Sequence, residues 1–166
     1  MWYKNVKLIL DSLKILHDGG MDFRVLFVGD GYDAPAIRAY AEDCGLAEKA
    51  IFAGAVHDRE YLRVFYSVSD LFLFPSTYDT SGIVVKEAAA CSCPSILIKG
   101  SCASEGIEDM VSGLLCGENA ESFAEKIASV LNNDNILKNI GKCAEEKVYC
   151  SWETSVQKAV KRYEIV

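Results

Sequence analysis

The chain has 166 residues, of which 51% are hydrophobic and 25% are charged, and its formal net charge is −7. This length and apolar fraction suit one well-packed domain and exclude two ordinary ones. The negative charge disfavours long-range attraction to nucleic acid or to an anionic membrane. No run approaches the roughly 20 apolar residues of a membrane-spanning helix, and the first residues do not resemble a signal peptide.

The predicted elements of the first two thirds alternate between helix and strand. In chain order they are a helix at 6–16, a strand at 23–28, a helix at 33–44, a strand at 50–53, a helix at 61–66, a strand at 71–74, a helix at 82–90 and a strand at 95–98. Asp33 and Asp58 are expected to cap two of these helices. Continuously apolar strands separated by amphipathic helices indicate one parallel sheet covered on both faces. The fold class is therefore a Rossmann-like, doubly wound α/β domain.

The last third is predicted to be mainly helical. A short strand at 113–116 precedes helices at 122–131, at 135–149 and from Trp152 onward. No linker separates them, so these extra C-terminal helices are expected to pack on the same domain, with Trp152 and Tyr163 pinning the last one to the sheet. The first predicted helix is not preceded by the strand that such a unit normally follows. We therefore expect residues 1–166 to form one domain that lacks its first strand.

The seven cysteines indicate a reducing cytoplasm rather than a disulfide framework, because their number is odd and most lie within apolar runs. Cys91 and Cys93 are two positions apart, and no histidine or second close cysteine pair follows at a spacing that completes a tetrahedral zinc site. We expect no metal site and no cofactor.

Ligands of open parallel sheets bind beyond the carboxyl ends of the strands, and the richest loop there follows the strand at 71–74. It carries Asp79 and leads through Gly82 into a helix that carries Glu87. Free backbone N–H groups and the positive end of the helix dipole suit a phosphate, and Gly82 would let the ligand approach. Asp79 and Glu87 would bracket that phosphate and accept hydrogen bonds from sugar hydroxyls. The loop therefore predicts a nucleoside diphosphate sugar as ligand.

This loop resembles the signature of the group 1 glycosyltransferases of sequence family 4, which have the GT-B fold. That signature has two glutamates eight apart around a Gly-hydrophobic pair, then small residues ending in Cys-Gly-x-Pro; here it runs from Asp79 to Glu87 and on to Pro94. Further segments match landmarks of the family in the same order: Val28-Gly29-Asp30-Gly31, Phe52-Ala53-Gly54, Ser69 to Ser76, Ser112 to Leu115 and Ser151-Trp152-Glu153. The resemblance covers nearly the whole chain and implies the C-terminal half of a GT-B glycosyltransferase.

The resemblance also implies roles for individual residues. Glu87 would hold the nucleotide ribose and Asp79 the transferred sugar, while Lys4 matches the family's diphosphate-binding lysine. The backbone of three successive residues would contact the sugar and phosphate region: Gly82, Ile83 and Val84. A partner arginine is expected upstream, in the missing first strand.

Two further positions are assigned in the same way. The backbone around Gly31 would border the donor pocket, and Glu105 matches an acidic position in a loop near the donor. Three departures stand out. Asp79 replaces a glutamate, which shortens its reach by about 1.5 Å. Thr80-Ser81 replaces the usual residue and phenylalanine before the glycine, which makes the loop more polar, and Ser92 replaces a glycine at a turn that we expect to tolerate it.

The implied function is retaining transfer of a sugar from a nucleotide diphosphate donor, of UDP or GDP type, as in hexosyltransferases of cell-surface polysaccharide biosynthesis. A glycan or lipid-linked acceptor would be held by an N-terminal domain absent from these residues. The full-length protein would be cytoplasmic, with peripheral contact at the inner membrane face, and the isolated domain is expected to be inactive.

Two alternatives remain open. A nicotinamide-dependent oxidoreductase is suggested by the glycine pattern from Gly29 to Ala34 after the strand at 23–28. Against it, Asp30 and Asp33 would put negative charge beside a pyrophosphate, and no acidic residue ends the next strand. A noncatalytic nucleotide-binding module of the same fold is favoured by Asp79 in place of glutamate.

Overall fold

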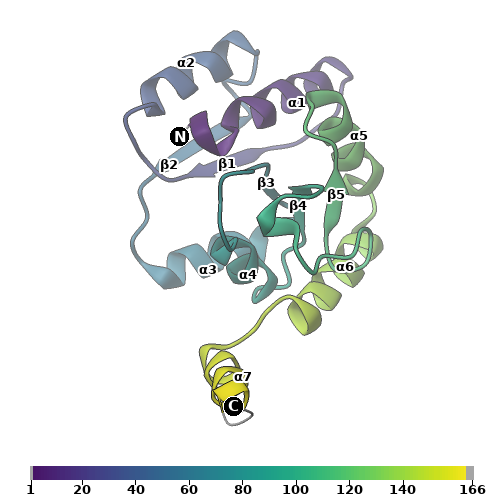
Figure 1. Ribbon diagram of the computed structural model, residues 1–166. Coiled ribbons are helices and arrows are strands. Elements are labelled where there is room, and N and C mark those ends of the chain that lie inside the picture. Colours follow the sequence, from purple (N-terminus) through teal and green to yellow (C-terminus); the bar gives the residue numbers. More distant parts are fainter. Residues whose placement is uncertain (1, 164–166) are drawn as a thin grey trace.

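A computed structural model describes residues 2–163, with only the backbone described at residue 158, and it has an α/β architecture (Figure 1). In chain order the elements are η1 (Trp2–Lys4), α1 (Val6–Asp18), β1 (Val25–Val28), α2 (Ala34–Asp43), β2 (Ala50–Gly54), α3 (Arg59–Val68), β3 (Phe72–Phe74), α4 (Ile83–Ala89), β4 (Ser95–Ile98), η2 (Cys102–Ser104), β5 (Leu114–Cys116), α5 (Ala120–Leu131), α6 (Asp134–Lys147) and α7 (Trp152–Tyr163). The predicted order and type of the elements are confirmed, and their ends differ by a few residues. Residues 1 and 164–166 of the predicted domain lie outside the described residues.

The strands are parallel, as predicted, but they form two sheets instead of one. β1 pairs with β2, and β3, β4 and β5 form a separate three-stranded sheet in that order. The predicted α/β fold class with parallel strands is confirmed, but the expected single sheet is divided into two among the described strands. The strands of the smaller sheet are also incompletely covered, since Ile51 in β2 is 47% exposed and Val28 in β1 is 38% exposed.

Both sheets nevertheless pack against one hydrophobic core. Alternate residues of β1 (Val25 and Phe27) and the Leu71 and Leu73 side chains around β3 pack against the same apolar cluster, which α1 and α5 cover. Because successive side chains of a strand point to opposite faces, these contacts place the two sheets over one shared face. A smaller cluster lies on the opposite face of the larger sheet, around Phe74 and the α4 residue Val85.

β4 lies at the centre of the larger sheet, and all four of its residues are buried. Ile96 and Leu97 are fully buried on opposite faces, one in each apolar cluster. A strand that has neighbouring strands on both edges and helices on both faces is shielded from solvent. The continuous apolar pattern predicted at 95–98 is explained by this position.

Side-chain caps explain where several helices begin. The Asp58 carboxylate accepts a hydrogen bond from the Glu60 N–H at 2.8 Å, so the predicted cap of α3 is confirmed. The predicted cap at Asp33 is wrong in its chemistry. Asp33 stands at the start of α2 without a side-chain bond to that helix, and its carboxylate accepts the backbone N–H of Trp2, 31 residues earlier.

The last helices behave differently from one another. α5 packs against α1 and α6 packs against α5 and α4, so these extra helices join the domain as predicted. α7, yellow in Figure 1, extends away from the rest. Trp152 and Tyr163 at its two ends are each 83% exposed. The prediction that they pin the last helix to the sheet is wrong, because helical periodicity marks an apolar face without fixing what covers it.

α6 crosses close to the turn between α4 and β4. A side-chain carbon at Gly141 would lie 2.0 Å from the carbonyl oxygen of Ser92, so only glycine fits at this crossing. Ser92 itself has a positive φ of 53° and its hydroxyl donates a hydrogen bond to the Glu145 carboxylate. The turn tolerates serine where the resemblance has glycine, because α6 supplies that additional bond.

Candidate functional site at the carboxyl edge of the strands

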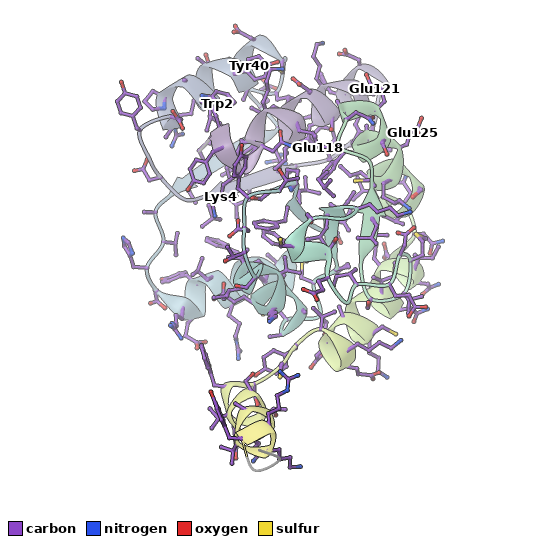
Figure 2. The ribbon with its side chains drawn as sticks, in the orientation of Figure 1. Trp2, Lys4, Tyr40, Glu118, Glu121 and Glu125 are labelled. Atoms are coloured by element: carbon purple, nitrogen blue, oxygen red, sulfur yellow. The ribbon has the colours of Figure 1, made fainter. Side chains whose placement is uncertain are left out.

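The loops that follow β1, β3 and β4 carry the residues predicted from the sequence. The start of the chain lies among them: the Trp2 N–H contacts Asp33 after β1, and Lys4 contacts Asp79 after β3. Trp2 also packs edge-on against Tyr40 of α2, with ring centroids 6.0 Å apart (Figure 2). η1 is therefore held between the loops after β1 and β3.

Lys4 and Asp79 form an ion pair although they are 75 positions apart. The Lys4 Nζ donates to the Asp79 Oδ2 at 3.3 Å, and the two side chains are 42% and 31% exposed. An ion pair this exposed contributes only about 0–1 kcal/mol. The structure thus brings together a lysine and a carboxylate that were predicted separately. Breaking this ion pair to bind a ligand would cost little free energy.

Gly82 caps α4 in the left-handed conformation, with φ 54° and ψ 44°. A side-chain carbon there would lie 2.9 Å from the Ala103 Cβ of η2. Gly82 was predicted to let the ligand approach; the structure adds two constraints on this position, a positive φ and a close contact with η2. Ile83 and Val84 form the first turn of α4, whose early N–H groups have no partner within the helix.

Glu87 lies on the exposed side of α4, one turn beyond Ile83. Its charge acts on Tyr66 of α3: burial first, and the Glu87 carboxylate second, raise the pKa of Tyr66. The Tyr66 phenol therefore stays protonated and polar beside Glu87. The proximity of Glu87 and Tyr66 was not predictable from the sequence, because it arises from the tertiary contact between α3 and α4.

Gly31 lies at the carboxyl end of β1, as predicted. Its N–H donates to the Asp30 carboxylate at 2.8 Å, and Asp33 accepts from the N–H of Trp2. Two carboxylates thus occupy the turn in which a dinucleotide pyrophosphate needs free N–H groups. The geometry counts against the oxidoreductase alternative.

A cavity of about 310 Å³ adjoins Gly82 between the start of α4 and η2. Ser81 and Lys86 line one side and Cys102 and Glu105 the other, whereas Lys4, Asp79 and Glu87 are not among the lining residues. The predicted residues are thus divided: Gly82 and Glu105 border the cavity, and the ion pair and Glu87 lie outside it.

Ser76 ends one of the matched family segments but was not predicted as a site residue. It follows β3, is 1% exposed, and its hydroxyl has no hydrogen-bond partner among the described residues. A buried polar group without a partner is costly and needs an explanation. Its place in the predicted site loop was visible in the sequence, but its burial was not, because serine is usually exposed.

Comparison with known proteins identifies the class of protein that this fold and site define. A family model described as Glycosyl transferases group 1 matches residues 1–147, and the chain belongs to this family. It is 26% identical over 147 residues to the N-acetyl-alpha-D-glucosaminyl L-malate synthase of Bacillus anthracis, which covers 88% of the chain and 37% of that protein.

Solved structures match the fold over the full length of the chain, with GT-B glycosyltransferases as neighbours. The sucrose-phosphate synthase of Thermosynechococcus elongatus matches with a TM-score of 0.87 at 23% identity, covering 99% of the chain and 42% of that protein. Anabaena HepE, in complex with UDP and glucose, matches with a TM-score of 0.80 at 20% identity, covering 98% and 45%. The chain thus spans about two fifths of the length of these proteins.

Among residues 2–163, no helix is long and apolar enough to cross a membrane. In the same stretch, no three histidine, cysteine or acidic side chains are grouped to hold a metal ion. All seven cysteines are free.

Proposed function

We propose that this chain is the C-terminal, donor-binding domain of a retaining glycosyltransferase of sequence family 4. It binds a nucleotide diphosphate sugar at the carboxyl edge of its strands, and the acceptor binds to a domain outside these 166 residues. Family membership and the UDP complex named for a structural relative support a nucleotide-sugar ligand.

The Lys4–Asp79 ion pair is the observation that carries the proposal. The diphosphate of the donor carries two negative charges, whereas Asp79 carries one. Lys4 therefore binds the diphosphate in place of Asp79, and the Asp79 carboxylate no longer has an ion-pair partner in Lys4. Asp79 then accepts hydrogen bonds from hydroxyls of the transferred sugar. Breaking the Lys4–Asp79 ion pair thereby provides a binding group for the diphosphate and another for the sugar.

The remaining roles follow from the position of α4. Gly82, Ile83 and Val84 present backbone N–H groups to the sugar and phosphate region, and Gly31 borders the pocket. Glu87 stands about 7.5 Å along the helix axis from Gly82, a separation that suits the ribose of the same donor. Lys4 and the first-turn N–H groups stabilise the charge that grows on the departing diphosphate. They supply this positive charge themselves, so the proposal includes no cofactor.

The proposal extends to the whole protein. A glycan or lipid-linked acceptor meets the donor sugar in the cleft between two domains, and the isolated chain binds nucleotide without transferring sugar. Free cysteines are stable in a reducing cytoplasm. We place the full-length enzyme there, working on cell-surface polysaccharide precursors at the inner membrane face.

Calorimetric titration with UDP and with GDP tests this function. We expect one of them to bind, and Glu87→Ala to weaken binding by about 1–3 kcal/mol, since the hydrogen bonds from ribose to the carboxylate are lost. Glu146→Ala, which changes an exposed glutamate near the end of α6, is the matched control and should leave affinity unchanged. Binding of neither nucleotide, or equal affinity of the Glu87 variant and the wild type, would refute the proposal. Stabilisation by NAD alone would favour the oxidoreductase.

A further inference from the structure

A second cavity, which we call the amino-edge pocket, lies at the amino ends of β1 and β2. Its volume is about 460 Å³. The residues around it end α1 or lead into the two strands, and they are His17, Asp22, Phe23, Arg24, Gly45, Ala47, Glu48 and Lys49. Because β1 and β2 are parallel, their amino ends meet at one edge of the sheet. The loop of Gly31 follows the other end of β1, so the amino-edge pocket is separate from the candidate donor site.

Backbone hydrogen bonds and the core hold the two segments that form this pocket. The Val25 N–H donates to the Lys49 carbonyl at 2.9 Å, which joins the segment before β1 to the segment before β2. Leu46, in the second segment, is fully buried in the core. Gly45 has a positive φ of 76°, and a side-chain carbon there would lie 3.6 Å from the His17 ring. The imidazole therefore lines the wall beside the glycine, and the pocket is framed before any ligand binds.

Lys49 is the least exposed charged side chain of the pocket. It is 22% exposed, and its Nζ lies 5.0 Å from the centre of the Phe23 ring, whose face attracts a cation. The same Nζ donates to the Asp22 Oδ1 at 3.1 Å, but the Asp22 side chain is fully exposed. The lysine is thus held by its surroundings, whereas its carboxylate partner can turn into solvent.

Arg24 adds a second positive charge at the same place. Its side chain is exposed, and it forms no ion pair or hydrogen bond with residues 2–163. Lys49 first, and Arg24 to a smaller extent, lower the pKa of Asp22. Both cations therefore act on the position of the Asp22 carboxylate. An anion bound at that position would be stabilised by both of them.

The chemistry of the pocket suits a phosphate group. A phosphate monoester carries about two negative charges, and an arginine and a lysine together can bind several of its oxygens. Asp22 holds this position with a single charge, and an exposed ion pair of this kind is weak enough for a ligand to replace it. Glu48 lines the same cavity, and its carboxylate can accept hydrogen bonds from hydroxyl groups. The volume of the cavity lies in the range of ordinary small-molecule sites.

We propose that the amino-edge pocket binds a phosphate monoester of a small hydroxylated compound. Lys49 and Arg24 bind the phosphate in place of the Asp22 carboxylate. His17 and Glu48 contact the hydroxyl groups of the rest of the ligand. This ligand does not compete with the sugar donor, because the pocket lies at the opposite edge of the sheet. The chain therefore has a second ligand site besides the one proposed for the donor.

An NMR titration of the isotope-labelled chain with glycerol 3-phosphate is the first test. We expect the amide signals of Arg24, Gly45 and Lys49 to shift until the site is saturated, and glycerol or sodium chloride at the same concentration to have little effect. Shifts confined to Gly82 and Ile83 would mean that the phosphate binds at the start of α4 instead. Equal shifts with sodium chloride would mean that any anion suffices. Either result, or the absence of shifts, overturns the proposal, and none of them bears on whether UDP or GDP binds.

Substitutions of the charged residues are the second test. Lys49→Gln and Arg24→Gln should each weaken the binding of glycerol 3-phosphate by about tenfold or more, because each removes a hydrogen bond between charged groups. Asp22→Asn should strengthen it by about threefold, because the ligand no longer competes with a carboxylate. Lys138→Gln, which changes an exposed lysine of α6, is the matched control and should leave affinity unchanged.

The two cation variants do not depend on each other. Arg24 is exposed, so its substitution keeps the fold and tests the site even if Lys49→Gln is unstable. Unchanged affinity of the Arg24 variant overturns the proposal. Weaker binding by Asp22→Asn also overturns it, because the carboxylate would then be part of the site rather than a group that the phosphate replaces.

Discussion

The two sheets of this protein share one core but differ in how completely that core encloses them. In the three-stranded sheet, β4 has a strand on each edge and a helix layer on each face, and all its residues are buried. In the two-stranded sheet, residues of β2 alternate between partly buried and exposed. Strands of similar apolar sequence are therefore buried to different extents, depending on how many strands and helices surround them. The candidate site is formed by loops from both sheets, so its geometry depends on how the two sheets pack against each other.

The largest contrast should come from two glycines. Gly141→Ala places a methyl group 2.0 Å from the Ser92 carbonyl beside the larger sheet, and we expect it to cost about 4 kcal/mol or more, because two backbones must separate. Gly54→Ala in β2 has a positive φ of 72° but no atom within 4 Å, so it should cost about 1–2 kcal/mol. Urea unfolding of both variants measures this difference. Similar losses would contradict the close crossing of α6.

Truncation of isoleucines compares the sheets directly. Ile96→Ala in β4 removes a fully buried side chain and should cost about 3 kcal/mol. Ile51→Ala in β2 removes a side chain that is 47% exposed and should cost about 1 kcal/mol. Thermal and denaturant unfolding test the pair. If Ile51 proves as costly as Ile96, its outer face is covered by something, and the comparison of the sheets fails.

A pH-dependent contrast should be smaller. Partial burial alone would raise the pKa of Asp109, but hydrogen bonds from the Leu115 N–H and Lys126 outweigh it and hold the pKa below its ordinary value of 3.8. Because the folded pKa is lowered, the stabilisation is fully present above pH 3.8 and is lost as pH falls through the folded value.

Asp109→Asn should therefore lower stability at pH 7 and at pH 5 by equal amounts, and progressively less below pH 4. Asp22→Asn is the control beside the smaller sheet, since Asp22 pairs with Lys49 but is fully exposed. It should change stability very little at any pH. Unfolding curves across this range check both variants. A loss at Asp109 that does not shrink in acid would reject the carboxylate's role.

The smallest effect should be at Ser92. Its positive φ costs about 1 kcal/mol, which glycine would remove, but glycine also loses the hydrogen bond to Glu145. These terms nearly cancel, so Ser92→Gly should change stability by less than about 1 kcal/mol. Combining it with Glu145→Gln separates the two terms. A large loss in the single variant would mean that the hydroxyl does more than bind Glu145.

Much of the fold followed from local patterns. Helices α1 to α6 and all five strands were predicted in order, because periodicity, glycine stops and caps such as Asp58 act over a few residues. The failures concern partners. Asp33 was assigned to its own helix but binds Trp2, and the apolar face of α7 was assigned to the sheet but lies exposed. Neither the Asp33–Trp2 contact nor the exposure of α7 can be deduced from neighbouring residues in the sequence.

The candidate site divides in the same way. The sequence by itself determined that Asp79, Gly82 and Glu87 stand at the carboxyl end of a buried strand, and its motifs determined the family. Only the tertiary structure decided that Lys4 meets Asp79, that Gly82 is constrained by Ala103, and that the sheet is interrupted between β1 and β3. The reason is physical: hydrophobic periodicity and capping are short-range and recorded in the order of residues, whereas pairing across tens of residues depends on how the finished layers pack.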